Sequence, residues 1–149
     1  MKEIITELIK TIDKYNYLLL HFNEEKFSRK PRPDKWSKKE ELGHLIDSAQ
    51  NNIQRFIRVQ YEHVHIMYNP DHWAEFNDYQ HADMKELVEL WYLLNKQIVR
   101  ILQKMDPAYY ENFIDIGYEM PNPKTTHFIA EDYVMHMKHH LENIFADVK

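Results

Sequence analysis

The sequence of 149 residues contains no cysteine and only two glycines, Gly43 and Gly117. Without cysteine the chain has no thiolate of its own, so any reactive centre must be built from imidazole and carboxylate groups. The shortage of glycine disfavours hairpins and tight turns, because many of those turns need residues with positive φ. Helices are therefore favoured over strands.

Strong positive charge and long apolar runs are also missing. The net charge of -5 creates no basic field, which argues against nucleic acid as the main partner. The longest aliphatic run is Leu18 to Leu20, far short of the roughly 20 residues that a membrane span needs. The first residues also lack the unbroken apolar stretch of a signal peptide. We therefore expect a soluble cytoplasmic protein with no membrane partner.

The composition that remains, 44% hydrophobic and 13% aromatic, predicts a packed globule. The length predicts one domain over residues 1–149. Apolar residues return at three- and four-residue steps in four segments, the pattern of amphipathic helices. The predicted helices cover about residues 2–21, 37–61, 83–106 and 125–147. Without strand alternation, they predict an all-α fold, a four-helix bundle with two long connections, between helices 2 and 3 and between helices 3 and 4.

Local signals support the helix boundaries. Ser37 and Glu40 have the spacing of a capping box at the start of the second helix, and Asp83 begins a similar motif at the third. Thr125 or Thr126 can cap the fourth. Between the second and third helices, residues 61–80 are too aromatic for a plain solvated loop. Long ordered connections are often functional, and this one could cover a pocket.

Ten residues are histidine, and His136 and His140 lie four apart in the predicted fourth helix. That spacing points two ring nitrogens the same way, one turn apart, at one margin of the apolar stripe. A divalent metal ion could use the pair and would need a further ligand from elsewhere. The alternative is two half-exposed boundary histidines, because so histidine-rich a chain produces such pairs by chance.

Helix 2 offers His44 as the third ligand. Helical periodicity places it nearly opposite the centre of the apolar stripe, which predicts exposure to solvent. However, the polar side of this helix from His44 to Arg55 has no lysine or glutamate, unlike an ordinary solvated face. A weakly charged face of this kind more often lines a cavity or an interface, so the two indications conflict.

The aromatic connection contains a rival histidine cluster. It consists of four residues: His63, His65, His72 and His81. His63 and His65 could bind a metal ion together if the segment were extended. The simpler interpretation is that these histidines pack among the surrounding aromatic side chains.

Two motifs stand out, one in helix 2 and one in helix 4: Trp36-Ser-x-x-Glu40-x-x-x-His44-Leu-x-Asp47 and Asp132-Tyr-x-x-His136-x-x-x-His140-x-x-x-Ile144. With Tyr68-Asn-Pro-Asp-x-Trp73 between them, they make the chain resemble the DinB/YfiT-like superfamily over nearly its whole length. The resemblance implies a four-helix bundle, which periodicity also predicts. It further implies a divalent metal ion, Zn or Ni, held by three histidines: His44, His136 and His140.

The resemblance also bears on function. Members of the superfamily include thiol-S-transferases that use bacillithiol or related low-molecular-weight thiols, and mycothiol-dependent isomerases are related in fold. Members are often homodimers. We therefore expect a metal-dependent enzyme with a small-molecule substrate, whose metal activates an external thiol or water, as a transferase or a hydrolase. The alternative is a non-catalytic helical bundle that binds a small molecule or a protein partner.

Four further residues have expected roles. Glu40 and Asp132 each lie four residues before a proposed ligand and could orient it by bonding its far ring nitrogen, although Glu40 also has a place in the helix cap. Asn51 and Arg55 lie further along helix 2 from His44 and are candidates for contacting the substrate.

Overall fold

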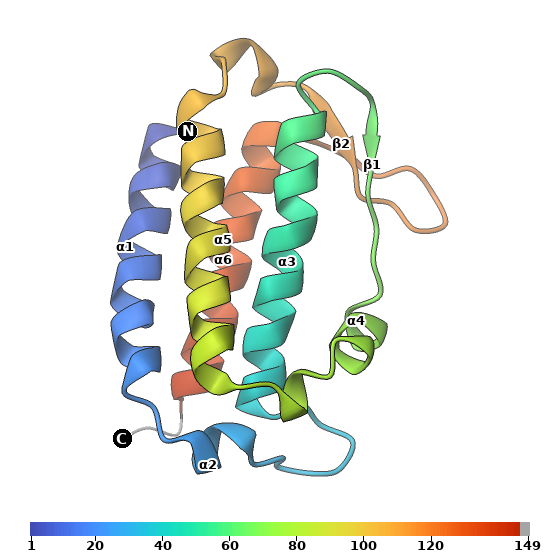
Figure 1. Ribbon diagram of the computed structural model, residues 1–149. Coiled ribbons are helices and arrows are strands. Elements are labelled where there is room, and N and C mark those ends of the chain that lie inside the picture. The colour runs from blue at the N-terminus through green and yellow to red at the C-terminus, as the bar shows by residue number, and fades with distance from the viewer. Residues whose placement is uncertain (147–149) are drawn as a thin grey trace.

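The computed structural model describes residues 1–146 of the chain. Four long helices run along the molecule (Figure 1): α1 (Lys2–Leu20), α3 (Lys38–Arg58), α5 (Met84–Lys104) and α6 (Thr126–Phe145). The connections contain two short helices, α2 (Glu24–Ser28) and α4 (Pro70–Phe76), and two 3₁₀ turns, η1 (Tyr79–His81) and η2 (Pro107–Tyr109). The predicted four-helix bundle is confirmed. The predicted end of the last helix, near Asp147, lies outside the described residues.

The helix starts follow the capping signals in the sequence. The Ser37 hydroxyl accepts from the Glu40 backbone N–H at 3.1 Å, and the Glu40 carboxylate accepts from the Ser37 N–H at 2.8 Å. The Asp83 side chain caps α5 through the N–H of Glu86. Thr125, rather than Thr126, caps α6. These bonds satisfy donors that a helix leaves unpaired in its first turn.

The order of the helices explains the length of the first connection. Both α1 and α3 pack against α5 and α6, so α1 and α3 occupy opposite corners of the bundle. The neighbours α3 and α5 run in the same direction (Figure 1). Parallel neighbours cannot be joined by a short turn, so the chain between them must return along the bundle. It does so beside α3 and places α4 and η1 against that helix.

Three short strands, which the sequence did not predict, connect the two long loops. They are β1 (Val64–His65), β2 (Phe113–Asp115) and β3 (Pro123–Thr125). β1 pairs in parallel with β2, and β2 pairs antiparallel with β3. Segments of two or three residues are too short to show an alternating pattern. Gly117 lies in the β2–β3 turn, where a Cβ atom would overlap the backbone of Met120.

Helix α3 is buried on nearly every side. Each residue from Leu42 to Ala49 is buried, because α5, α6 and the α4–η1 segment surround the helix. The Tyr79 ring packs directly on the backbone of Gly43, where a Cβ atom would overlap it. The polar residues of this stretch, His44, Asp47 and Ser48, are therefore inside the protein.

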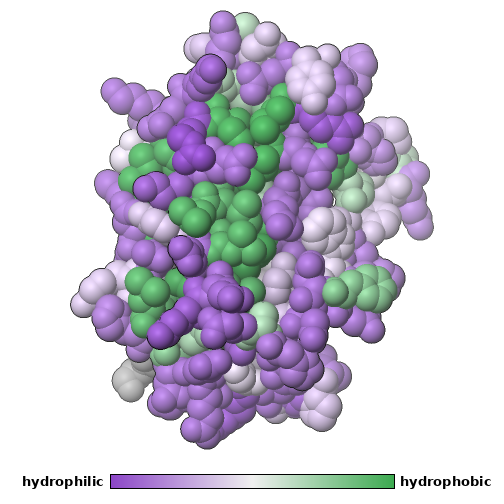
Figure 2. Space-filling model, in the orientation of Figure 1, coloured by the Kyte–Doolittle hydropathy of each residue, from purple (hydrophilic) through white to green (hydrophobic). Residues whose placement is uncertain are grey.

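The exposed apolar surface lies elsewhere. Figure 2 shows a band of apolar residues along α5, and the exposed apolar residues include Leu90 and Leu93 of α5 and Ile57 of α3. The side of α3 that meets the connection is polar at its surface. No helix within residues 1–146 is long and apolar enough to cross a membrane.

Candidate metal centre

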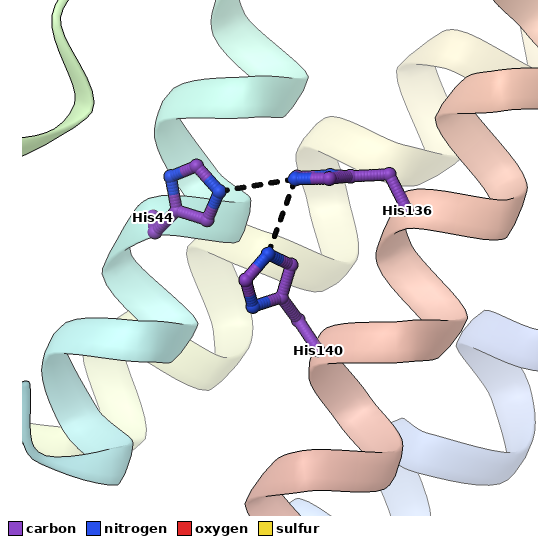
Figure 3. Close-up of side chains that lie close together, drawn as sticks. All are labelled: His44, His136 and His140. Atoms are coloured by element: carbon purple, nitrogen blue, oxygen red, sulfur yellow. Dashed lines mark hydrogen bonds between the residues drawn. The ribbon is translucent and has the colours of Figure 1, made fainter.

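Three histidines from two helices meet at one point. His44 extends from α3, and His136 and His140 extend from successive turns of α6 (Figure 3). The Nε2 atom of His136 lies 3.2 Å from Nε2 of His44 and 3.1 Å from Nε2 of His140. The structure therefore brings together the three residues that the sequence motifs singled out.

The spacing of these nitrogens fits a metal ion. In a tetrahedral site with metal–nitrogen bonds of about 2.0–2.1 Å, two ligand nitrogens lie roughly 3.3–3.4 Å apart. The two distances from the His136 nitrogen are slightly shorter, and the ligand nitrogens of all three residues lie within 4.8 Å of one another, so rotations of the rings would bring them to this spacing. Within residues 1–146 this is the one group of three or more metal-ligating side chains that come close enough together.

Glu41 orients His140. Its Oε1 atom lies 2.9 Å from His140 Nδ1, and both side chains are largely buried. A proton on Nδ1 donated to this carboxylate leaves the Nε2 lone pair free to face the other two rings. Glu40 was expected to orient His44, but its carboxylate caps α3 and pairs with Lys30 at 3.1 Å, and His44 Nδ1 has no hydrogen-bond partner among the described residues.

Burial keeps two of the rings neutral. Desolvation, reinforced by the neighbouring imidazoles, lowers the pKa of His44 to about 3 and that of His136 to about 4. A neutral imidazole is the form that binds a metal ion. His44 is only 5% exposed, so the exposure predicted from helical periodicity was wrong. The cause is the connection packed on α3, together with the Trp36 ring 5.2 Å from the His44 ring.

Asp47, one turn beyond His44, attaches the connection to α3. This fully buried carboxylate accepts from the Tyr79 hydroxyl at 2.5 Å and from the Asn77 amide at 3.2 Å. Burial raises its pKa to about 6. Because Tyr79 also packs on Gly43, the same contacts hold the segment that covers the His44 side of α3.

A cavity of about 230 Å³ lies beside the histidines. It is bounded by α3, α6 and the two long connections. Its lining residues are Ser48, Asn52, Arg55, Met67, Tyr68, Ile116, Ile129, Asp132, Tyr133 and His136. His136 therefore belongs to both the cavity and the histidine cluster, so a molecule in the cavity would reach the candidate metal centre.

Of the two residues expected to contact the substrate, Asn51 and Arg55, one lines the cavity. Arg55 lines the cavity. Asn51 does not, because it is buried elsewhere with its amide donating to the Asp47 carbonyl at 2.9 Å. The next residue, Asn52, takes that position, since one residue turns the helix face by about 100°. Asp132 lines the same cavity as Arg55. Burial lowers the pKa of the Arg55 guanidinium, and the charge of the Asp132 carboxylate acts in the opposite direction.

Sequence reasoning missed several cavity residues. Ser48 and Asn52 were recognised as part of a weakly charged face, but no role followed from that. Tyr68 lies in the aromatic connection and lines the cavity together with Ser48. The absence of lysine and glutamate from this side of α3 was the signal that could have identified Ser48 and Asn52.

The rival histidines of the connection are dispersed. His65 Nε2 lies 2.8 Å from the Gly117 carbonyl, and His81 pairs with Asp78 at 2.6 Å. His72 packs on Phe76 with ring centroids 5.8 Å apart, and His63 is exposed. They do not form a metal-binding group among the described residues.

Comparisons with known proteins agree with this architecture. The sequence model of the DinB superfamily matches residues 7–144. Among solved structures, YfiT from Bacillus subtilis, described as a probable metal-dependent hydrolase with an unusual four-helix bundle topology, superposes with a TM-score of 0.86 at 20% identity, covering 97% of this chain and 83% of YfiT. No curated protein matches the sequence.

Two further structures share the fold. The DinB-like protein YjoA from Bacillus subtilis has a TM-score of 0.67 at 18% identity, covering 97% of this chain and 88% of YjoA. A mycothiol-dependent maleylpyruvate isomerase has a TM-score of 0.68 at 12% identity, covering 99% of this chain and 60% of the isomerase. At these identities the likeness establishes the fold, and function must be argued from the site.

Proposed function

This chain belongs to the DinB superfamily, and from its three converging imidazoles we propose that it is a metal-dependent enzyme acting on a small molecule. His44, His136 and His140 would hold a divalent ion, with Zn and Ni as the leading candidates. The observation that carries the proposal is the approach of three Nε2 atoms from two helices. Three protein ligands leave an open position, which distinguishes catalytic from structural sites.

The protein side of the mechanism follows from the contacts. Glu41 fixes the tautomer of His140, and the low pKa values of His44 and His136 keep those rings unprotonated. His44, His136 and His140 would hold the divalent ion, which would supply Lewis acidity that lowers the pKa of a bound water or thiol. The Trp36 ring and the connection limit the access of solvent to His44.

The activated group is water or an external thiol. The chain has no cysteine, so thiol transfer would require a low-molecular-weight thiol from solution. The cavity beside His136 would hold the second reactant. There, the Tyr68 hydroxyl can donate a hydrogen bond, because burial raises its pKa and keeps it protonated. A cytoplasmic location and a homodimeric assembly complete the proposal.

The first test is the metal content of protein purified without a histidine tag. We expect a near-stoichiometric divalent ion in the wild type and its loss in His44→Ala and His136→Ala. His139→Ala is the matched control, because His139 is an exposed neighbour on α6 outside the cluster. Metal that survives in His44→Ala and His136→Ala would overturn the proposal, as would a wild type that takes up none on reconstitution.

A second test separates the two reactions. Metal-loaded protein is assayed on an ester and amide panel without thiol, and with a small thiol plus an electrophilic dye. Turnover in the first assay alone identifies a hydrolase, and turnover that requires the thiol identifies a transferase. If the metal raises the melting temperature but neither assay responds, the non-catalytic bundle is the correct alternative.

A further inference from the structure

The charged end of the cavity indicates what kind of molecule enters it. We infer that the cavity binds a small carboxylate-bearing molecule, with Arg55 holding its carboxylate and the remainder directed toward His136. The identity of the reacting end rests on the proposed function. The carboxylate anchor is argued from Arg55 and its surroundings and can be tested without the metal.

Arg55 is held in place with donors to spare. Its Nη2 donates to the Ile66 carbonyl at 2.6 Å and its Nη1 to the Asn52 amide oxygen at 3.4 Å. Its Nε is buried and has no partner. A guanidinium carries five N–H donors, so these contacts orient the group and leave several donors unused. A carboxylate matches that planar arrangement with two parallel hydrogen bonds.

The nearest opposite charge does not satisfy Arg55. Asp132 lines the same cavity, and its charge favours the protonated guanidinium, yet no ion pair joins the two among the described residues. The Asp132 carboxylate would repel a second negative charge. That repulsion favours a singly charged carboxylate over a doubly charged phosphate.

The other residues of the cavity wall indicate what the rest of the bound molecule is like. Besides Arg55 and His136, the wall includes three apolar side chains from the two connections and α6: Met67, Ile116 and Ile129. At about 30 Å³ for each water-sized unit, the cavity of about 230 Å³ holds on the order of eight non-hydrogen atoms. A short acid with an apolar middle section, such as a six-carbon chain, fits this description.

The test measures binding of hexanoate by calorimetry to the whole protein. Hexanamide, which has the same shape without the charge, and inorganic phosphate are the comparison probes. Each is measured on metal-loaded wild type and on His44→Ala, because a carboxylate could also bind the metal directly. We expect hexanoate to bind both proteins, and to bind better than hexanamide and phosphate.

Two substitutions at the anchor and one opposite it make the test specific. We expect Arg55→Gln to weaken hexanoate binding at least tenfold and Arg55→Lys to weaken it less, because hydrogen bonds to a charged group are lost or reduced. Asp132→Asn should strengthen binding several-fold by removing the repulsion. Circular dichroism and metal content, unchanged in all three variants, verify that the fold and the metal centre are intact.

Several outcomes would overturn the inference. Equal hexanoate affinity in wild type and a folded Arg55→Gln would do so, as would equal affinity for hexanamide. Weaker binding in Asp132→Asn would show that the site also needs its negative charge, against a single-anion ligand. Because metal content is measured separately, a failure here leaves the proposed function standing, and a failure of metal binding leaves this result unaffected.

Discussion

The two sides of α3 are both buried, but they are buried by different partners and for different purposes. One side is apolar and belongs to the hydrophobic core, with Leu42, Ile46 and Phe56 fully buried. The side that faces the connection and α6 carries His44 and Asp47, which are equally inaccessible. Burial of the first side stabilises the fold through the hydrophobic effect. Burial of the second costs free energy unless its polar groups find partners.

The comparison shows how a polar helix face becomes a site. On this side of α3, Asp47 accepts from the Tyr79 hydroxyl, and the His44 ring lies against the imidazoles of His136 and His140; these partners come from residues far away in sequence. Some groups remain unsatisfied, among them His44 Nδ1 and Arg55 Nε. Unsatisfied buried groups are expected where a ligand completes the structure.

The largest effect is expected from displacing the α4–η1 segment, which covers the polar side of α3. Replacing Gly43 by alanine should destabilise the protein by about 2–3 kcal/mol, because the new Cβ overlaps the Tyr79 ring. The same change in an open helix interior would stabilise by roughly 0.5–1 kcal/mol, so the sign is diagnostic. Urea unfolding measures it.

A double mutant provides the control for that prediction. Tyr79→Ala alone should destabilise, because it removes a buried ring and a hydrogen bond to Asp47. With the ring absent, Gly43→Ala should cost little further free energy. Additive effects in the two variants would contradict a direct clash between these positions.

A smaller effect is expected on metal affinity, and it should differ between the adjacent residues Glu40 and Glu41. Glu41→Gln should weaken metal binding about tenfold, because the carboxylate that orients His140 loses its charge. Glu40→Gln should leave metal affinity unchanged, since glutamine can replace glutamate in a capping box. Competition with a chelating dye measures both affinities. Equal losses in the two variants would contradict the assignment of Glu41.

The last prediction concerns the dependence of the free energy of unfolding on pH. Because the folded-state pKa of Asp47 is raised to about 6 from an ordinary value of 3.8, the wild type loses stability relative to Asp47→Asn as the pH rises from about 4 to 6. The difference should change by about 3 kcal/mol, since each pKa unit corresponds to about 1.4 kcal/mol, and then level off. The histidines are common to both proteins, so their titration cancels. A difference that is flat with pH would show that burial does not perturb Asp47.

The fold followed from the sequence because local signals repeat over long segments. Apolar spacing of three and four residues, with Ser37 and Asp83 as caps, predicted the long helices. The strands escaped prediction, since their two or three residues are too few to show a period. The site was partly predictable, because the motifs singled out the three histidines. Helical periodicity, however, wrongly predicted that His44 is exposed. Roles were expected for Glu40 and Asn51, whereas Glu41 bonds His140 and Asn52 lines the cavity.

The sequence by itself determined which segments are helical, where they start and which side of each is apolar, because these properties depend on neighbours a few residues apart. Only the tertiary structure decided the environment of the polar side of α3. The parallel arrangement of α3 and α5 forces the connection to return beside α3 (Figure 1), and Tyr79 then closes over Gly43. That long-range packing buries His44 beside α6 and places Arg55 in the wall of a cavity.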